Sequence, residues 1–304
     1  MKTKTLSRSA GRIPCPNAPA AGPVFARLLL PVALALAASL SAAPAGVRVV
    51  SQTVGTDELL LALAAPGQIA ALSPLARDPE FCAAAEDARG YPTIAPNGDA
   101  ESVLKFNPTL VLCADYSRAE MVAQLRRAGR RVILFDRYTT LADSYANLRR
   151  LGRELGREDR AERVIGECEG RVAALEARLR RVRPVRVIAP STFGVIPGAQ
   201  STFQDLCDHA GAENLAWTLG HITGHGPQPS EEMLTWPVDF VVVAGADIGA
   251  ALAPFRALPP YEFMPAVKSG RAVLLPPAQL SCVSHLRVDG YEILARALHP
   301  EAFR

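Results

Sequence analysis

Residues 141–182 read LADSYANLRRLGRELGREDRAERVIGECEGRVAALEARLRRV, and this stretch decides the fold. In its first part, apolar side chains recur every three or four residues, at Leu141, Tyr145, Leu148, Leu151 and Leu155. In its second part they recur in the same way, at Ala161, Val164, Ile165, Cys168, Val172, Leu175 and Leu179. Each part therefore predicts an amphipathic helix with one apolar stripe.

A break separates these two predicted helices. Gly156 and the charged run 157–160 interrupt the apolar spacing, and Arg183-Pro184 ends the second helix. At about 1.5 Å per residue, a second helix of about 25 residues spans roughly 37 Å, the width of a small domain. We expect this helix to join two lobes at a fixed spacing, which leaves a cleft for a small molecule between them.

The regions on either side of this stretch alternate predicted strands and helices. The predicted strands are 47–50, 69–73, 109–113, 131–135, 185–189, 240–244 and 272–275. The predicted helices outside the central stretch are 59–65, 80–88, 101–106, 118–128, 203–210, 230–234 and 288–298. Such alternation is typical of parallel sheets with both faces covered. The fold class is therefore α/β, with two lobes of mostly parallel sheet joined by a single long backbone helix.

The 304 residues suit two domains, and the start of the chain has the pattern of a signal peptide. A cationic segment up to Arg27 precedes an apolar run of about thirteen residues, too short to cross a bilayer, and small residues follow it. We expect residues 1–45 to be a cleavable signal peptide without a lipobox, 46–140 the first lobe, 141–183 the helical connection and 184–304 the second lobe. This organisation predicts a protein that is exported to an oxidising compartment.

The charge outside the predicted leader argues against a nucleic-acid partner. Residues 1–45 hold five of the 33 basic residues and no acidic residue, so 28 basic and 30 acidic residues remain. Nucleic-acid binding needs a clustered excess of basic residues. The remaining cysteines are Cys82, Cys113, Cys168, Cys207 and Cys282, an odd number that leaves at least one thiol free or paired between chains. Cys113 and Cys168 fit buried positions, and a disulfide between Cys207 and Cys282 is left open.

From Val47 onward, the order and spacing of several stretches resemble one known family. The stretches are 49–53 with 56–58, 101–111, 151–158, 198–206 with 210–214, and 265–271, which read VVSQT, TDE, ESVLKFNPTLV, LGRELGRE, GAQSTFQDL, AGAEN and PAVKSGR. They resemble the periplasmic binding proteins for cobalamin, iron–siderophore complexes and haem, which are partners of ABC importers. The resemblance implies two lobes joined by one long helix, and a ligand that lies between the lobes.

The resemblance also implies a surface that docks on the permease. In cobalamin-type members, one Glu at the tip of each lobe pairs with permease arginines. The matching positions here are Glu101 and Glu232. An acid in the first turn of a helix also interacts favourably with the helix dipole. Either permease docking or helix stability therefore explains these two residues.

Polar and aromatic residues that follow the predicted strands are the candidates for the cleft, because ligands of parallel sheets meet the loops beyond the strands' carboxyl ends. They are Gln52, Thr53, Arg77, Tyr91, Tyr116, Arg137, Phe193, Gln200, His221, His225, Gln279, Ser281 and His285. Aromatic rings suit a flat macrocycle, and arginines suit the carboxylates of haem or of an anionic siderophore.

Two of these candidates are also possible axial ligands of a chelated metal. His225 follows His221 in a glycine-containing loop, and imidazole is a common ligand of iron and cobalt. Tyr91 occupies a region in which haem-binding relatives place an axial tyrosine, although the surrounding residues 92–96 depart from that pattern. We expect no direct metal site and no cofactor of the protein's own.

The sequence therefore predicts a monomeric, non-enzymatic solute-binding protein that delivers a metal chelate to an ABC permease. A corrinoid such as cobalamin or a ferric siderophore is the expected ligand, and haem is the alternative. The sequence contains no Gly-x-Ser-x-Gly, His-Glu-x-x-His, P-loop or Gly-x-Gly-x-x-Gly motif. A periplasmic enzyme on a similar scaffold, or a sensor that reports the ligand to a membrane receptor, remain the alternatives from other classes.

Overall fold

The first sheet contains four parallel strands in the order β2-β1-β3-β4 in the computed structural model, which describes residues 46–304. Their bounds are β1 (Val49–Ser51), β2 (Ile69–Ala71), β3 (Leu110–Ala114) and β4 (Arg131–Phe135). Every residue of the central strand β3 is buried, as its unbroken apolar sequence predicts. The predicted signal peptide lies outside the described residues.

Helices cover both faces of this first sheet. They are α1 (Val54–Leu63), η1 (Pro66–Gln68), α2 (Ala85–Ala88), α3 (Ala100–Leu104) and α4 (Ala119–Arg127). On β3, Leu110 and Leu112 pack in one core with Leu60 of α1, whereas Val111 packs in the opposite core with Leu125 of α4. Successive strand residues point to opposite faces, so each face has its own apolar core.

The second sheet is also parallel, in the order β10-β9-β5-β7. Its strands are β5 (Val185–Ile188), β7 (Ala212–Asn214), β9 (Phe240–Ala244) and β10 (Ala272–Leu275), and a separate antiparallel ribbon pairs β6 (Val195–Pro197) with β8 (His225–Pro227). The helical elements of this part are α7 (Thr202–Ala210), α8 (Leu215–Thr218), η2 (Glu232–Thr235), α9 (Ile248–Leu252), η3 (Phe255–Ala257), η4 (Tyr261–Phe263), α10 (Pro265–Lys268), α11 (Pro277–Leu280), α12 (Arg287–Leu298) and η5 (Pro300–Phe303).

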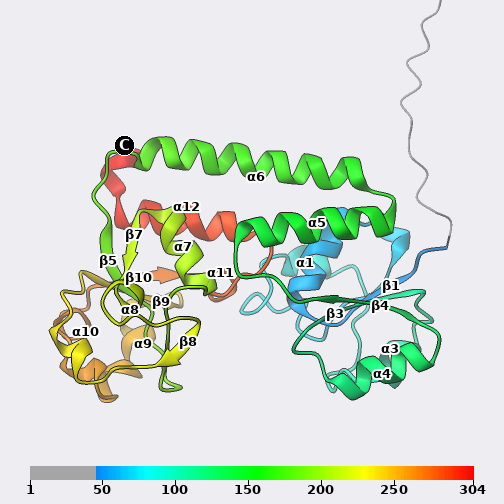
Figure 1. The fold of residues 1–304 in the computed structure, drawn as a ribbon, viewed down its shortest axis with the longest axis horizontal. Coiled ribbons are helices and arrows are strands. Elements are labelled where there is room, and N and C mark those ends of the chain that lie inside the picture. Colours follow the sequence, from blue (N-terminus) through cyan, green and yellow to red (C-terminus); the bar gives the residue numbers. More distant parts are fainter. Residues whose placement is uncertain (1–45) are drawn as a thin grey trace, which may run out of the picture. The chain divides into compact units, whose positions relative to one another are not determined.

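Two consecutive helices, α5 (Leu141–Leu155) and α6 (Glu158–Leu179), join the two sheets, as the sequence predicts. Gly156 separates them with a left-handed backbone at φ 63°, a conformation that glycine adopts without strain. The first half of α6 packs in the core of the first sheet, and the second half, with Cys168 and Leu175, packs in a core of the second sheet. Figure 1 shows α6 passing over both α5 and α12. The prediction of two α/β parts and a long backbone helix is confirmed.

A second segment crosses between the two parts at residues 281–286. The Ser144 hydroxyl donates to the Val283 carbonyl at 3.2 Å, and the Cys282 thiol donates to Glu58 of α1 at 3.7 Å. Gly55 permits this approach, because a Cβ there would lie 2.4 Å from the Val283 side chain. The crossing segment therefore packs directly on α1.

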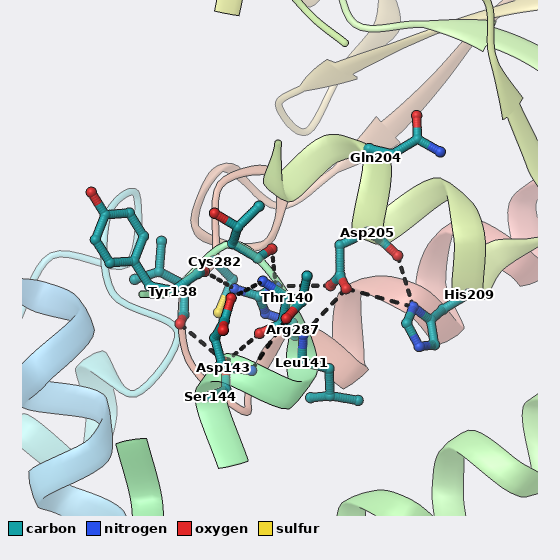
Figure 2. Close-up of polar contacts among 12 residues, drawn as sticks. Tyr138, Thr140, Leu141, Asp143, Ser144, Gln204, Asp205, His209, Cys282 and Arg287 are labelled. Atoms are coloured by element: carbon teal, nitrogen blue, oxygen red, sulfur yellow. Dashed lines mark hydrogen bonds and ion pairs between the residues drawn. The ribbon is translucent and has the colours of Figure 1, made fainter. Parts of the chain in front are cut away.

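A buried ion pair lies where the chain enters α5. Arg287 donates to Asp205 at 2.8 Å, and its side chain is 2% exposed. The same guanidinium donates to the carbonyls of Tyr138 at 2.6 Å and Thr139 at 2.7 Å. Asp205 in turn accepts from the Leu141 amide at 3.2 Å. Figure 2 shows that α5, α7 and α12 all contribute to this cluster, which ties the connection to the second sheet.

Two helix predictions in the first part need correction. The helix expected at 59–65 begins earlier, at Val54, because the Thr56 hydroxyl accepts from the Thr53 amide at 3.3 Å and caps the first turn. The helix expected at 80–88 is reduced to α2, because the Asp78 side chain accepts from the Glu80 amide at 2.9 Å and stabilises a turn instead. In the second part, the helix expected at 230–234 is the 3₁₀ turn η2.

All five cysteines of the described residues are buried free thiols, so the disulfide between Cys207 and Cys282 that the sequence left open is not formed. Burial raises the pKa of Cys113 to about 12 and that of Cys168 to about 11. None of the helices within residues 46–304 has the length and apolar character that a membrane span requires.

We expect Arg287→Met to lower the free energy of unfolding by about 3–5 kcal/mol, because it leaves the Asp205 carboxylate buried without its cation. Urea unfolding of the two proteins measures the loss. The control is Arg149→Met, which removes a partner of Glu162 at 2.8 Å in a pair that is largely exposed. That change should leave the free energy of unfolding nearly unchanged, because solvent screens an exposed pair. Equal losses in the two variants would contradict a dominant role for the buried pair.

The buried Asp57 of α1 should make the free energy of unfolding depend on pH. Burial raises its pKa from 3.8 to about 7, against the opposing effect of hydrogen bonds from Ser51 and Ser73. The folded state therefore holds this proton more tightly than the unfolded chain, and the free energy of unfolding falls as pH rises from about 4 to about 7. The loss is on the order of 4 kcal/mol and is complete above about pH 7.

Asp57→Asn should remove this slope, because the amide stays neutral and still accepts from the Ser73 amide. Thermal unfolding between pH 4 and pH 8 measures the difference from the wild type. Asp136→Asn changes an exposed carboxylate of the same lobe and should retain the wild-type slope. A wild-type slope that persists in Asp57→Asn would show that other groups cause it.

Candidate functional site

A groove of about 480 Å³ lies at the edge of the first sheet where its strands end. It is lined by Gln52, Thr53, Val54, Ser73, Pro74, Leu75, Pro96, Asn97, Gly98, Tyr116, Ser117 and Arg118. Gln52 follows β1, Ser73 follows β2 and Tyr116 follows β3, so three strand ends supply the polar lining. The structure thus brings together three of the residues predicted for the cleft, Gln52, Thr53 and Tyr116.

Hydrogen bonds hold the polar floor of the groove in place. The Ser117 hydroxyl donates to the Gln52 side-chain carbonyl at 2.6 Å and accepts from the Ala114 amide at 3.1 Å. Gly98 has φ 54°, and a Cβ there would lie 3.4 Å from the Gln52 side-chain nitrogen. This glycine therefore lets the loop at 96–98 approach the Gln52 amide.

Two tyrosines form the aromatic side of this region. The rings of Tyr116 and Tyr138 meet edge to face with their centroids 6.0 Å apart. The Tyr138 hydroxyl donates to Asp115 at 3.0 Å. Desolvation and this carboxylate raise the pKa of Tyr138 to about 12, so its phenol is protonated at neutral pH. Beside both rings lies a small recess of about 20 Å³, lined also by Phe135 and Val283.

Leu75 and Arg118 complete the groove with an apolar and a cationic side chain. Leu75 is 43% exposed, a high value for a large apolar residue. The Arg118 side chain is exposed and donates to the Asn97 carbonyl at 2.8 Å. The groove therefore offers an aromatic ring, an aliphatic surface, amides and one cation to a single ligand.

Three further candidates of the first lobe lie outside the groove lining. Arg77 donates to the Tyr91 backbone carbonyl, and the half-buried Tyr91 side chain packs against the core that α1 and β1 form. Arg137 is exposed and pairs with Asp143, the N3 residue of α5, at 3.0 Å. These side chains are thus engaged with the fold itself.

Three candidates of the second lobe lie in or beside the ribbon of β6 and β8. The Ala199 amide donates to the Ile222 carbonyl at 2.8 Å, which holds Gln200 and His221 near each other. Both residues have a left-handed backbone, at φ 56° and φ 52°. His225 lies in β8, and the side chains of all three are exposed. Phe193 precedes the ribbon and is 88% exposed, so it also faces solvent.

The remaining candidates of the second lobe lie elsewhere. Gln279 is buried and accepts from the Gly290 amide at 3.1 Å, so it supports α12. Ser281 is exposed at the start of the crossing segment. His285 is 7% exposed and lines a separate pocket of about 290 Å³ with Glu58 and Arg160, beside α6. Burial lowers the pKa of His285 to about 4, so the imidazole is neutral. Gln279 and His285 therefore lie outside the lining of the groove.

The two acids predicted to dock on a permease are both exposed. Glu101 lies in the first turn of α3, with its carboxylate 3.3 Å from Lys105, and Glu232 begins η2 in the other lobe. The Asp99 side chain accepts from the Ser102 amide at 2.8 Å and caps α3. Neither Glu101 nor Glu232 caps a helix, so helix capping does not explain these two acids. Their docking on a permease stays a prediction.

Sequence reasoning missed several groove residues, among them Leu75, Asn97, Ser117 and Arg118. Leu75, Ser117 and Arg118 lie within four residues of a strand end, so a wider window after each strand would have found them. Asn97 has no such signal, because the fold alone brings its loop beside Arg118. Within residues 46–304, no group of three His, Cys, Asp or Glu side chains is arranged to hold a metal ion.

Solved structures share this fold over most of the chain. The periplasmic heme-binding protein RhuT from Roseiflexus sp. RS-1, in apo form, is 22% identical, covers 84% of this chain and 99% of its own, and has a TM-score of 0.72. A periplasmic heme-binding protein from Pseudomonas aeruginosa is 23% identical, with 83% and 92% covered and a TM-score of 0.68. A possible iron-binding (periplasmic solute-binding) protein from Staphylococcus epidermidis is 16% identical, with 83% and 98% covered and a TM-score of 0.70.

These identities are low enough that the likeness shows the fold alone. No match is found among curated proteins. The sequence itself matches the model of a protein family, described as periplasmic binding protein, over residues 49–279. This range includes both sheets, the connecting helices and the groove. The chain therefore belongs to the periplasmic binding protein family, of the type with two lobes and a helical backbone.

Proposed function

We propose that the protein captures a metal chelate between its two lobes and delivers it to the permease of an ABC importer. Its family consists of transport components, which supports binding without chemical conversion. The groove supports a ligand site at the carboxyl edge of the first sheet, where parallel α/β proteins bind ligands. The exposed ribbon of the second lobe supplies the opposing surface in this proposal.

The proposal depends mainly on the exposed aromatic ring in the groove. Tyr116 is 64% exposed, although burial of a ring that size is favourable. With Leu75 it offers a flat apolar surface, and a planar macrocycle stacks well on such a surface. Phe193 offers a second exposed ring on the other lobe. A tetrapyrrole chelate therefore fits better than a small polar solute.

Within this class we place a corrinoid first and haem second. The amides of Gln52 and Asn97 in the groove match the amide-rich periphery of a corrinoid. Arg118 matches a carboxylate such as a haem propionate. Two of the structurally similar proteins are described as heme-binding, which supports haem as the alternative. A ferric siderophore, with its larger and less planar shape, comes third.

The axial position of the metal is a further part of the proposal. Tyr91 packs against the core of the first lobe, so it is a poor candidate for an axial ligand. His225 is exposed on the ribbon and is free to approach the metal. We therefore propose His225, if the ligand is haem. A periplasmic enzyme remains the alternative from another class, and conversion of a bound chelate by the purified protein would establish it.

Titration of the purified protein with cyanocobalamin, hemin and a ferric siderophore tests the ligand. Tryptophan fluorescence should fall on binding, because Trp217 meets His221 edge to face beside the ribbon, with the ring centroids 6.5 Å apart, and a bound chelate absorbs its emission. We expect Tyr116→Ala to weaken binding of the preferred chelate by up to about tenfold, the loss of one stacking contact. The matched control is Phe81→Ala, which removes a ring that is 52% exposed outside the groove lining. Unchanged affinity in Tyr116→Ala would exclude the groove as the site.

The hemin titration also distinguishes haem from a corrinoid. A shift of the Soret band that is lost in His225→Ala and kept in Tyr91→Ala would make haem the ligand, with His225 as its axial residue. A shift lost only in Tyr91→Ala would reverse the axial assignment. Binding of cyanocobalamin without any Soret shift from hemin would support the corrinoid.

The docking proposal predicts a transport defect without a binding defect. The double variant Glu101→Ala and Glu232→Ala should bind the chelate as the wild type does, but reduce uptake by cells that carry the cognate permease. Each lost charge pair at an interface rim slows association. Glu120→Ala with Glu169→Ala, two exposed acids elsewhere, is the control. Normal uptake by the first variant would remove the docking assignment.

A further inference from the structure

Arginines are concentrated at the carboxyl end of α6. Residues 178–186 contain Arg178, Arg180, Arg181, Arg183 and Arg186, and no acidic residue. Residues 46–304 as a whole hold 28 basic and 30 acidic residues. The local excess of positive charge is therefore a property of this end of the helix and not of the molecule.

A pocket of about 580 Å³ lies within this arginine-rich region. Its charged and titratable lining residues are Arg181, Arg183, Arg186, Asp239, His299 and Glu301. It lies where β5 begins, whereas the groove described above lies where the strands of the other sheet end. The pocket is thus separate from the proposed chelate site.

One cation of the pocket and two cations beside it are held in place. Arg186 donates to both carboxylate oxygens of Asp239, at 2.9 Å and 2.7 Å, which also neutralises that acid. Beside the pocket, the guanidinium groups of Arg178 and Arg296 lie 5.6 Å and 4.7 Å from the centre of the Phe303 ring. The surrounding positive charges are therefore ordered before any ligand arrives.

Arg181 and Arg183 differ from these neighbours. Both are exposed, and neither makes an ion pair among residues 46–304. Basic residues in the last turn of a helix stabilise its dipole, which would explain Arg178. Arg181 and Arg183 lie beyond Leu179, the last residue of α6, and the dipole effect falls off within the last turn. Stability of the helix therefore does not account for them.

We propose that this pocket is a second ligand site, which binds a phosphate-bearing anion through Arg181 and Arg183. A terminal phosphate has enough oxygens to engage two guanidinium forks at once, whereas one fork saturates a carboxylate. The site contains arginine and no lysine, as bidentate phosphate recognition favours. Glu301 is the one lining acid without a guanidinium partner; its side chain is 63% exposed and lies 3.8 Å from His299.

The volume of the pocket exceeds that of a single phosphate ion, so we expect a phosphate on a larger molecule. Such a group occurs on soluble organic phosphates and on the headgroups of anionic lipids. Pyrophosphate serves as the soluble probe. Vesicles of phosphatidylglycerol, with phosphatidylcholine vesicles as the reference, serve as the lipid probe.

Calorimetry with pyrophosphate at about 0.15 M salt tests the site in the purified protein. Arg181→Gln with Arg183→Gln should weaken binding about tenfold or more, because two charge-assisted contacts are lost. Glu301→Gln should strengthen binding by a few fold, since it removes the lining acid. The matched control is Arg126→Gln with Arg127→Gln, two exposed arginines in the last turn of α4, which should bind as the wild type does.

Binding to phosphatidylglycerol vesicles without binding to pyrophosphate supports the proposal and identifies a lipid headgroup as the source of the phosphate. The proposal is overturned if the wild type binds neither probe, if the Arg181 and Arg183 variant binds like the wild type, or if the α4 control loses as much. Equal binding of citrate and pyrophosphate would overturn the preference for phosphate. None of these outcomes depends on the chelate site, because the pocket shares no lining residue with the groove or the ribbon.

Discussion

The buried pair of Arg287 with Asp205 is the constraint on which the arrangement of the two lobes depends. Charges in a low-dielectric interior persist only when several hydrogen bonds satisfy them, and Arg287 meets this need with the carbonyls of Tyr138 and Thr139. Those carbonyls belong to the chain that has just left the first sheet. The start of α5 is thereby attached to helices of the second lobe, and the direction of α5 and α6 follows from that attachment.

A second attachment lies at the crossing segment, where Val283 packs against Gly55 and Cys282 reaches Glu58. Because two separate connections join the lobes, each restricts the rotation that the other allows. A long helix adds stiffness, since bending it breaks backbone hydrogen bonds. Such a molecule suits a ligand that is itself rigid and preformed, in agreement with the proposed chelate.

The candidate site shows how far sequence reasoning reaches. Gln52, Thr53 and Tyr116 come together because parallel strands end at one edge, a rule that needs only the strand assignments. The same rule also selected Gln279 and His285, which follow β10 but lie in a helix turn and in the crossing segment, outside the groove lining. The Gln279 side chain accepts from the Gly290 amide of α12, and the His285 ring is buried beside α6. Position after a strand identifies a residue as a candidate, but the packing of the next element decides which way it points.

The sequence by itself determined the helices and strands with strong periodicity, the break at Gly156, the parallel sheets and the long connecting helix. These features depend on the spacing of apolar residues along the chain, which is a local property. Only the tertiary structure decided that Asp57 and Glu58 are buried, that Cys207 and Cys282 stay apart, and that Arg287 meets Asp205. Each of these outcomes joins residues far apart in the chain, and its energy depends on burial and on partners that local spacing does not encode.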